Sequence, residues 1–169
     1  SVVNALSETL EVQVARDQQL YRMVFSRGEP QTKLEKLGSI MNRRGTKVRF
    51  RPDEKIFGKG CAFKPARLLK MARSKAYLFG GVEIRWKCDP AWIHDKTPAE
   101  ATFRFPNGLA DFLAELTEGV ETVTPTPFAV KIERKGETGS IEWAITWTGA
   151  GFGEADGFMK SYCNLIPTP

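Results

Sequence analysis

Cysteine and histidine are scarce in this sequence of 169 residues, and their scarcity excludes several kinds of chemistry. The three cysteines, Cys61, Cys88 and Cys163, lie far apart without a C-x-x-C pair, so we expect buried thiols in a reducing compartment rather than disulfides. The single histidine, His94, lies in a polar stretch and is expected to be a solvated loop residue. Neither a zinc site nor a Ser-His-Asp triad can be assembled from these residues.

Long apolar runs are also missing. No stretch approaches the roughly 20 apolar residues of a membrane span, and the first residues lack the basic and then apolar pattern of a signal peptide. We therefore expect a cytoplasmic protein that does not enter a membrane. Hydrophobic residues at 41% and charged residues at 27%, with only 10 prolines, exclude a disordered, collagenous or coiled-coil chain and indicate a globular fold.

Acidic residues are unevenly distributed along the chain. Residues 1–100 hold 20 Lys and Arg against 11 Asp and Glu, whereas residues 101–169 hold 5 against 9. Most of the basic excess lies in residues 41–87, which contain 14 basic residues and three acidic ones. This excess suggests a polyanion partner, either a nucleotide or the backbone of DNA, although a solvated basic surface without any partner explains the charge equally well.

Alternating apolar residues predict strands along most of the chain. Residues 10–14 and 20–25 flank Asp17 and Gln18, and this pattern predicts a β-hairpin. Residues 1–7 have the composition of a buried helix, yet no capping residue precedes them, so the chain resembles a piece cut from something longer. Further strands are expected at residues 34–37, 46–50, 82–86, 102–105, 128–132, 141–147 and 158–165.

Two segments change to the helical period. Pro65 suits a first helical position, and the apolar residues that follow share one face, which predicts a helix over residues 65–78. Asn107 is expected to open a second helix that runs through about residue 116. The face of the first helix opposite its apolar stripe is basic and carries Arg67, Lys70 and Arg73.

The remaining patterns predict connections rather than catalytic groups. Two prolines within residues 122–127 predict a linker, after which three antiparallel strands begin a second unit. The glycine-rich residues 149–153 are interpreted as a hairpin loop, because two acidic residues follow them and would repel phosphate. The neighbouring acids Asp53 and Glu54 are interpreted as solvated charges in a turn. No catalytic constellation can be built from the chain.

Several segments resemble the B subunits of bacterial type IIA topoisomerases, gyrase and topoisomerase IV. Residues 1–7, SVVNALS, are similar to the segment just after the ATP lid of that family. Residues 45–53, GTKVRFRPD, with Ile56 and Phe57, are similar to its signature G-T-x-V-x-F-x-P-D-x-x-I-F. The match continues in order at Lys75 and Ala76, at residues 107–113 and at residues 161–168. The sequences at residues 141–144 and 164–168 resemble topoisomerase IV more than gyrase.

This resemblance implies an α+β fold with two parts. Residues 1–120 would form the C-terminal part of a GHKL (Bergerat) helix-on-sheet sandwich, the fold of the ATPase domain. Residues 121–169 would form the first strands of a transducer domain that resembles the ribosomal S5 domain 2-like fold. We expect the strands within residues 10–87 to form one sheet that buries one face under the helices, including the helix at residues 65–78.

The resemblance also implies which part of an ATP site lies in this chain. Ser1 would stand at the helix N-terminus that receives the phosphate-binding loop, Thr46 would hydrogen-bond on the adenine side, and Val48 would form an apolar wall. The family's general base and Mg²⁺ ligand belong to a segment upstream, so no catalytic and no metal-binding residue is predicted here. Lys33 ends a Gln-Thr-Lys run like the family's γ-phosphate loop, but at the wrong place, and is assigned to solvent.

The function implied is that of the ATPase subunit of a type II DNA topoisomerase, in which ATP and Mg²⁺ drive a dimeric gate for the passage of duplex DNA. The implied partners are a topoisomerase A subunit, a second copy of the ATPase subunit in an A2B2 heterotetramer, and double-stranded DNA. Residues 1–169 alone are expected to be inactive. The alternative is a non-enzymatic module that binds nucleic acid through residues 41–87. Against it, aromatic residues that could stack on bases occupy positions that a core would claim: Phe50, Phe57, Phe63, Tyr77, Phe79 and Trp86.

Overall fold

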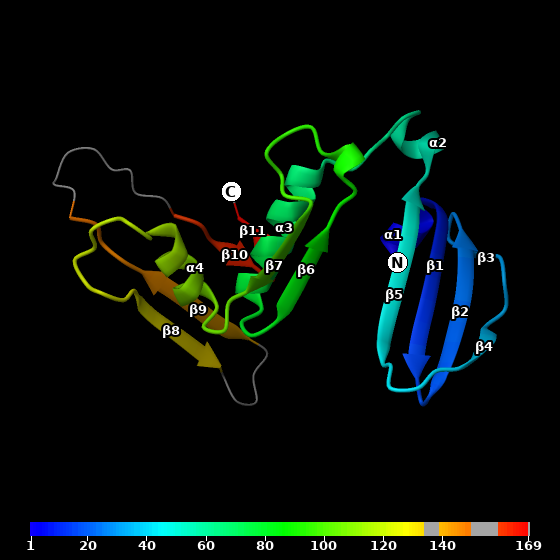
Figure 1. Ribbon diagram of the computed structural model, residues 1–169, viewed down its shortest axis with the longest axis horizontal. Helices are drawn as coiled ribbons and strands as arrows, with labels where there is room; N and C mark the ends of the chain where they lie inside the picture. The colour runs from blue at the N-terminus through cyan, green and yellow to red at the C-terminus, as the bar shows by residue number, and fades with distance from the viewer. Residues whose placement is uncertain (134–138, 150–158, 169) are drawn as a thin grey trace. The chain divides into compact units, whose positions relative to one another are not determined.

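The computed structural model describes residues 1–133, 139–149 and 159–168, and it divides the chain into two compact units. The first unit is Ser1–Ala62 and the second is Phe63–Pro169 (Figure 1). The domain boundary predicted after residue 120 falls inside the second unit and stays a prediction. Residues 150–153 of the glycine-rich segment interpreted as a hairpin loop lie outside the described residues.

The first unit is an antiparallel sheet with two helices of four residues each. The predicted hairpin is confirmed, since β1 (Ser7–Arg16) pairs with β2 (Gln19–Ser26) around Asp17 and Gln18, which both have positive φ. The sheet runs in the order β3-β2-β1-β5, with β4 also paired to β2. Its other elements are α1 (Val2–Ala5), β3 (Glu29–Pro30), β4 (Glu35–Ser39), β5 (Gly45–Pro52) and α2 (Glu54–Phe57).

One face of this sheet is apolar and only partly covered. Strand residues directly opposite each other point to the same face, and so do residues two apart on one strand. Leu10 is 5% exposed, but Val48 is 54% exposed on the same face. The apolar face is thus buried at Leu10 but exposed along β5, where Phe50, directly opposite Leu10, is 43% exposed. It consists of Leu10, Val12 and Val14 on β1, Tyr21, Met23 and Phe25 on β2, and Thr46, Val48 and Phe50 on β5.

The second unit is built around helix α3 (Pro65–Leu78), which begins with proline at its first position as predicted. Its buried core consists of Ala76, Tyr77, Phe105 and Phe112, and the rings of Tyr77 and Phe112 stack with centroids 3.8 Å apart. The other elements are β6 (Glu83–Lys87), the 3-10 helix η1 (Pro90–Trp92), β7 (Glu100–Arg104), α4 (Leu109–Leu116), β8 (Phe128–Glu133), β9 (Ser140–Ile145), β10 (Tyr162–Cys163) and β11 (Ile166–Pro167).

The last described residues pack onto α3. The hydroxyl groups of Tyr77 and Tyr162 lie 2.5 Å apart, and Lys75 Nζ donates a hydrogen bond to the carbonyl oxygen of Leu165 at 2.7 Å. Burial raises the pKa of Tyr77 above its usual range, and the contact with Tyr162 raises it further, so this hydroxyl stays protonated at neutral pH. The β10–β11 hairpin is thereby attached to the helix.

Three predicted features of the fold are wrong. The strands within residues 10–87 do not form one sheet, because β6 pairs with β7 rather than with the β1–β5 sheet. Helix α3 belongs to the same unit as β6 and β7. Alternation of apolar residues identifies a strand but not its partner. The strand expected at residues 158–165 is represented, among the described residues, by β10, which pairs with β11 and not with β9. The helix at the start of the chain is one turn without a buried residue.

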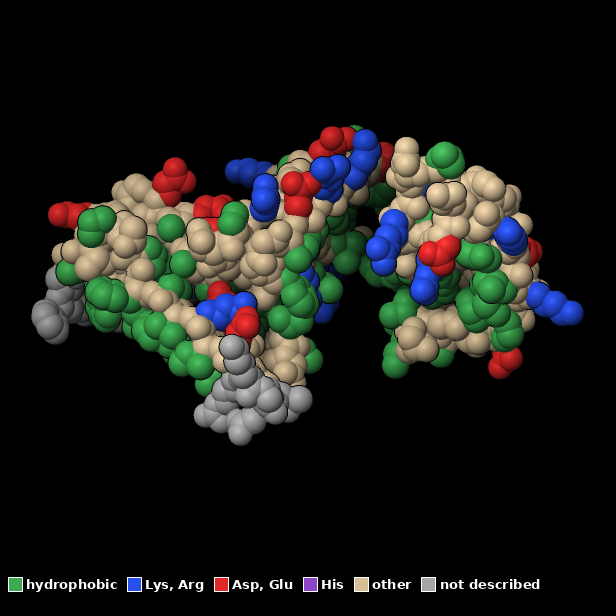
Figure 2. All heavy atoms as spheres, turned by 90° about the horizontal axis from the view of Figure 1, so that it is seen from below, with side chains coloured by type: hydrophobic (Ala, Val, Ile, Leu, Met, Phe, Trp, Pro, Cys, Tyr) green, Lys and Arg blue, Asp and Glu red, His purple; other side chains and the backbone are tan. Residues whose placement is uncertain are grey.

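The aromatic and cysteine side chains are more exposed than the sequence predicts. Cys61 and Cys88 are half-buried and Cys163 is exposed, although all three thiols are free. Of the six aromatic residues assigned to a core only Tyr77 is buried, while Phe50, Phe57, Phe63 and Phe79 are exposed. His94 is exposed, as predicted. One face of the β8–β9 pair is also apolar and exposed, and hydrophobic side chains gather on this side of the unit (Figure 2): Phe128, Val130, Ile132, Ile141, Trp143 and Ile145.

Candidate functional site

Helix α1 packs against β1 and β2 at one end of the first sheet (Figure 1). Ser1 is its N-cap, and the Ser1 hydroxyl oxygen accepts a hydrogen bond from the N–H of Asn4 at 3.4 Å. The N–H groups of Val2 and Val3 belong to the first turn, where no intrahelical carbonyl can accept them. The start of α1 therefore presents free donors, although a single turn has only a small dipole.

A hollow of about 480 Å³ lies between α1 and the apolar face of the sheet. It brings together two of the three residues that the sequence predicted for nucleotide binding, Ser1 and Val48. The third, Thr46, is not part of the lining, but it lies two residues from Val48 on the same face of β5, opposite Val14, and is exposed. The lining consists of Ser1, Val3, Asn4, Leu10, Val12, Phe25, Val48 and Phe50.

Asn4 is a lining residue that no sequence pattern selects. Its Nδ2 group donates to the carbonyl oxygen of Gly28 at 3.4 Å, while its Oδ1 atom is buried without a hydrogen-bond partner in the described part of the chain. A buried acceptor without a donor costs about 1 to 3 kcal/mol, and a water molecule or a ligand donor in the hollow would remove that cost. Asn4 therefore adds a second polar side chain, besides Ser1, to a largely apolar wall.

An ion pair between a buried carboxylate and an exposed guanidinium fixes the end of the sheet that carries α1. Asp53 is 2% exposed and accepts hydrogen bonds from Arg27 Nε at 2.5 Å and from the N–H of Lys55 at 3.0 Å. The Arg27 guanidinium, followed by the Lys55 N–H, holds the pKa of Asp53 below its usual range. The interpretation of Asp53 as a solvated charge is wrong, because this carboxylate caps α2 and pairs with Arg27. A signal was present in the sequence, since Asp directly before a helical segment is a common N-cap.

Backbone hydrogen bonds complete this polar anchor, which we define as Ser7, Arg27 and Asp53. The N–H of Arg27 donates to the carbonyl oxygen of Ser7, and the N–H of Asp53 donates to that of Leu6. Ser7 is 1% exposed, and its hydroxyl donates to the carbonyl oxygen of Val3 at 2.6 Å. Leu6 and Ser7, which follow α1, are thus both hydrogen-bonded to residues at the end of the sheet, and these bonds hold α1 over the hollow.

The described residues offer no cluster of three His, Cys, Asp or Glu side chains that could hold a metal ion. The Mg²⁺ ion implied by the resemblance therefore finds no ligand set in the part of the chain that is described. Within the same residues, every helix is too short or too polar to cross a membrane.

The comparisons with known proteins agree with the resemblance seen in the sequence. No family model matches the chain. The chain is 63% identical over its full length to the B subunit of DNA topoisomerase 4 from Caulobacter vibrioides, and 51% identical over 99% of its length to that from Bartonella bacilliformis. It spans about a quarter of the length of these relatives, 24% in each case.

A solved structure shares the fold. The crystal structure of the 43K ATPase domain of Thermus thermophilus gyrase B, in complex with an aminocoumarin, superimposes with a TM-score of 0.77 at 32% identity. The match covers 98% of this chain and 42% of that domain. This likeness confirms the predicted α+β fold class of a GHKL ATPase region. By sequence and by fold, the chain is similar along its whole length to a stretch of bacterial type IIA topoisomerase B subunits.

Proposed function

We propose that the hollow beneath α1 is one side of an ATP site. The observation that carries the proposal is that Ser1 and Val48, which lie far apart in the sequence, line the same hollow. Val48 and its apolar neighbours would cover one face of the adenine, Thr46 would hydrogen-bond at its edge, and the N–H groups at the start of α1 would approach the phosphates. Asn4 Oδ1 adds an acceptor for a ligand donor or an ordered water.

We propose further that the whole protein is the ATPase subunit of a type IIA topoisomerase and acts in the cytoplasm. ATP binding and hydrolysis would drive a dimeric gate for the passage of one DNA duplex through another, in an A2B2 assembly with a topoisomerase A subunit. The names of the relatives support this function, and the basic first part of the chain is compatible with double-stranded DNA as substrate.

The chemistry of hydrolysis is proposed to lie outside these residues. Phosphoryl transfer needs a group that orients water and a metal ion that neutralises the phosphates. The described residues contain no metal-ligand cluster, and the hollow lacks a carboxylate that could act as general base. What this chain's own residues can do is bind and orient one side of the nucleotide and exclude water from it. Residues 1–169 alone are therefore proposed to be inactive.

The proposal is tested with Thr46→Ala in the complete polypeptide. Loss of one hydrogen bond at the adenine edge should weaken the affinity for a non-hydrolysable ATP analogue about tenfold, measured by isothermal titration calorimetry. Thr102→Ala is the matched control, since Thr102 is also an exposed strand threonine but lies on β7 in the second unit. Equal affinities of wild type and Thr46→Ala would place Thr46 outside the site. ATPase activity of residues 1–169 alone would overturn the proposal that the groups for hydrolysis lie outside this chain.

A non-enzymatic module that binds nucleic acid remains the second candidate, and one observation favours it. The exposed Phe57, Phe63 and Phe79 lie in or beside the basic residues 41–87, so the argument that a core claims these rings does not hold. Stacking on unpaired bases would give such a module a preference for single strands over duplex. A measured preference for single-stranded DNA, with no binding of an ATP analogue, would replace the first proposal by this one.

A further inference from the structure

Helix α3 carries a concentration of positive charge that the nucleotide hollow does not use. Between Glu54 and Glu83 the sequence has seven Lys and Arg residues and no acidic residue. Three of these cations, Lys64, Arg67 and Lys70, are exposed at the start of the second unit. We call these three residues the α3 basic flank.

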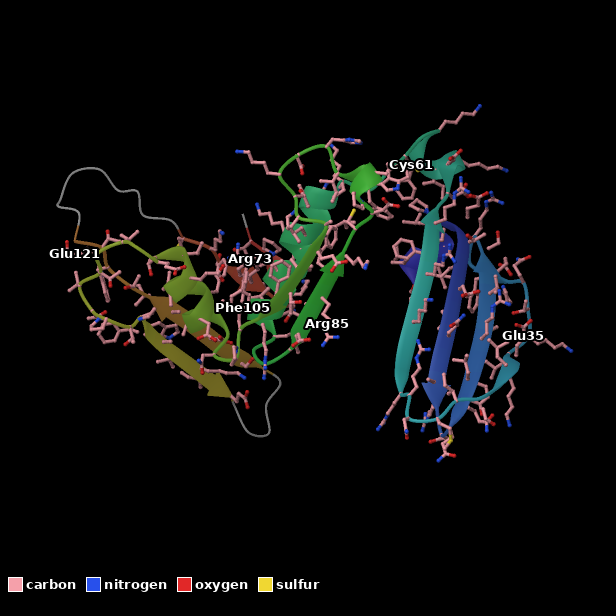
Figure 3. All side chains as sticks on the ribbon, viewed as in Figure 1. Glu35, Cys61, Arg73, Arg85, Phe105 and Glu121 are labelled. Atoms are coloured by element: carbon pink, nitrogen blue, oxygen red, sulfur yellow. The ribbon has the colours of Figure 1, made fainter. Side chains whose placement is uncertain are left out.

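The cations of α3 divide into two groups with different environments. Arg73, labelled in Figure 3, forms an ion pair with Glu115 and lies 5.6 Å from the ring centroid of Phe112. Lys75 donates to the carbonyl oxygen of Leu165. These two side chains hold the helix to its neighbours. The α3 basic flank, in contrast, forms no ion pair and no side-chain hydrogen bond within the described residues.

Helix stability does not explain the α3 basic flank. Cations near a helix N-terminus oppose the macrodipole, at a cost of about 0.3 to 1 kcal/mol each. Lys64 is the N-cap of α3 without a side-chain hydrogen bond, and the first turn holds no acid. Helix α4 shows the usual arrangement, with Asp111 in its first turn and the carboxylate of Glu142 accepting from the N–H of Leu109.

The three cations of the flank follow one another along the start of α3. Positions 64, 67 and 70 are three residues apart and follow one side of the helix with a rise of about 4.5 Å per step. Tyr77, the only aromatic residue within α3, is buried, and Phe63, directly before Lys64, is the one exposed ring next to the flank. Three unpaired cations beside a single ring favour contacts with phosphates, which position a protein without reading sequence, over stacking on unpaired bases.

We propose that the α3 basic flank binds the phosphate backbone of duplex DNA. The partner follows from the charge and exposure of Lys64, Arg67 and Lys70, and the contact does not depend on the nucleotide hollow. Each phosphate neutralised by the flank releases condensed counterions, so binding at this surface weakens steeply with salt.

The test uses Arg67→Gln/Lys70→Gln in the complete polypeptide, with fluorescence anisotropy of a labelled duplex of mixed sequence at several salt concentrations. The slope of log K against log salt should become shallower by about 1.8, because two phosphate contacts are lost at about 0.9 each. Glutamine is a good helix former, so α3 should be preserved. Arg85→Gln/Lys87→Gln is the matched control, since it removes the same charge from two exposed cations on β6, of which Arg85 is labelled in Figure 3. Arg85 pairs with Glu83, and Lys87 pairs with Glu100.

The outcomes separate this proposal from the proposed function. We expect Arg67→Gln/Lys70→Gln to leave the affinity for an ATP analogue unchanged and Thr46→Ala to leave the salt slope unchanged. Equal changes in slope for the test and control variants would overturn the proposal that the α3 basic flank binds duplex DNA, because net charge alone would then explain binding. An unchanged slope, or tighter binding of single strands than of duplex to wild type, would overturn it as well.

Discussion

The two units of the molecule bury different kinds of side chain. In the first unit the buried apolar residues are Leu10 and Ala15, and they are accompanied by the buried polar residues Ser7 and Asp53. In the second unit the buried residues are Ala76, Tyr77, Phe105 and Phe112, three of which are aromatic. The unit with the candidate site is thus anchored by hydrogen bonds and an ion pair, and the other unit is closed by an aromatic core.

The proposed nucleotide site would account for this difference. A face that is to contact a ligand must stay accessible, so a sheet with that role would leave some of its valines and phenylalanines uncovered. The polar anchor then fixes the end of the sheet by directional bonds rather than by buried area. The second unit has no such demand on its aromatic cluster, and stacking of Tyr77 on Phe112 contributes to a dry interior.

The largest effect is expected from Phe112→Ala in the second unit. Removing a buried ring should lower the free energy of unfolding by about 3 to 5 kcal/mol, through lost burial and the cavity left behind. Urea denaturation followed by circular dichroism measures the change. Phe128→Ala is the control, because this ring is 52% exposed and its loss should matter much less. Equal effects of the two substitutions would contradict an aromatic core centred on Phe112.

Gly108→Ala should have an intermediate effect in the same unit. Gly108 has φ 60° and ψ −121°, a conformation that favours glycine, and an added Cβ would overlap Glu142 Oε1. Backbone strain of this kind costs about 1 to 3 kcal/mol, so the thermal midpoint should fall. Combining Gly108→Ala with Glu142→Ala removes the overlap but keeps the strain. Full recovery in the double variant would show that the overlap and not the backbone conformation causes the loss.

The smallest effect is expected in the first unit from Asp53→Asn, and it should depend on pH. Asparagine can still cap α2, so the substitution mainly removes the charge paired with Arg27. The pKa of Asp53 is lowered in the folded state, so its contribution to stability is full above the unfolded value of about 3.9 and is lost as the pH falls through the lower folded value. Wild type should therefore be more stable at pH 7, and the gap should close below about pH 4.

Denaturation at a series of pH values measures this gap. Asp17→Asn serves as the control, because Asp17 lies exposed in the β1–β2 turn at a positive φ that asparagine tolerates. A gap between wild type and Asp53→Asn that stays constant from pH 7 to acid would mean that the Arg27 pair does not anchor the first unit.

Local signals in the sequence predict the elements well, and long-range contacts explain the failures. The hairpin at Asp17 and Gln18 and the helix from Pro65 depend on turn and cap residues that act over a few positions, and both predictions are confirmed. Helix α4 begins one residue after Gly108 rather than at Asn107, because Glu142 from β9 supplies the cap. No pattern near residue 107 could reveal a partner that lies more than 30 residues further along the chain.

The candidate site shows the same division. The motif resemblance selected Ser1 and Val48, and the fold brings both to one hollow, while the role of Thr46 stays a prediction. Asn4 and Asp53 were missed for a common reason, since the importance of each depends on burial among strands distant in sequence. Asn4 matters because its Oδ1 atom lacks a hydrogen-bond partner in the described part of the chain, and Asp53 matters because it is paired with Arg27. Composition and periodicity do not encode either property.

The attachment of the β10–β11 hairpin to α3 has a consequence for the order of folding. The Tyr77–Tyr162 contact joins residues 85 positions apart, and the Lys75–Leu165 contact joins residues 90 positions apart. Closing such a loop is entropically costly before other contacts have formed, so we expect this attachment to arise after the barrier has been crossed. Contacts that form late act on the unfolding rate and leave the folding rate nearly unchanged. The two tyrosine hydroxyls therefore determine how long the second unit stays folded more than how fast it folds.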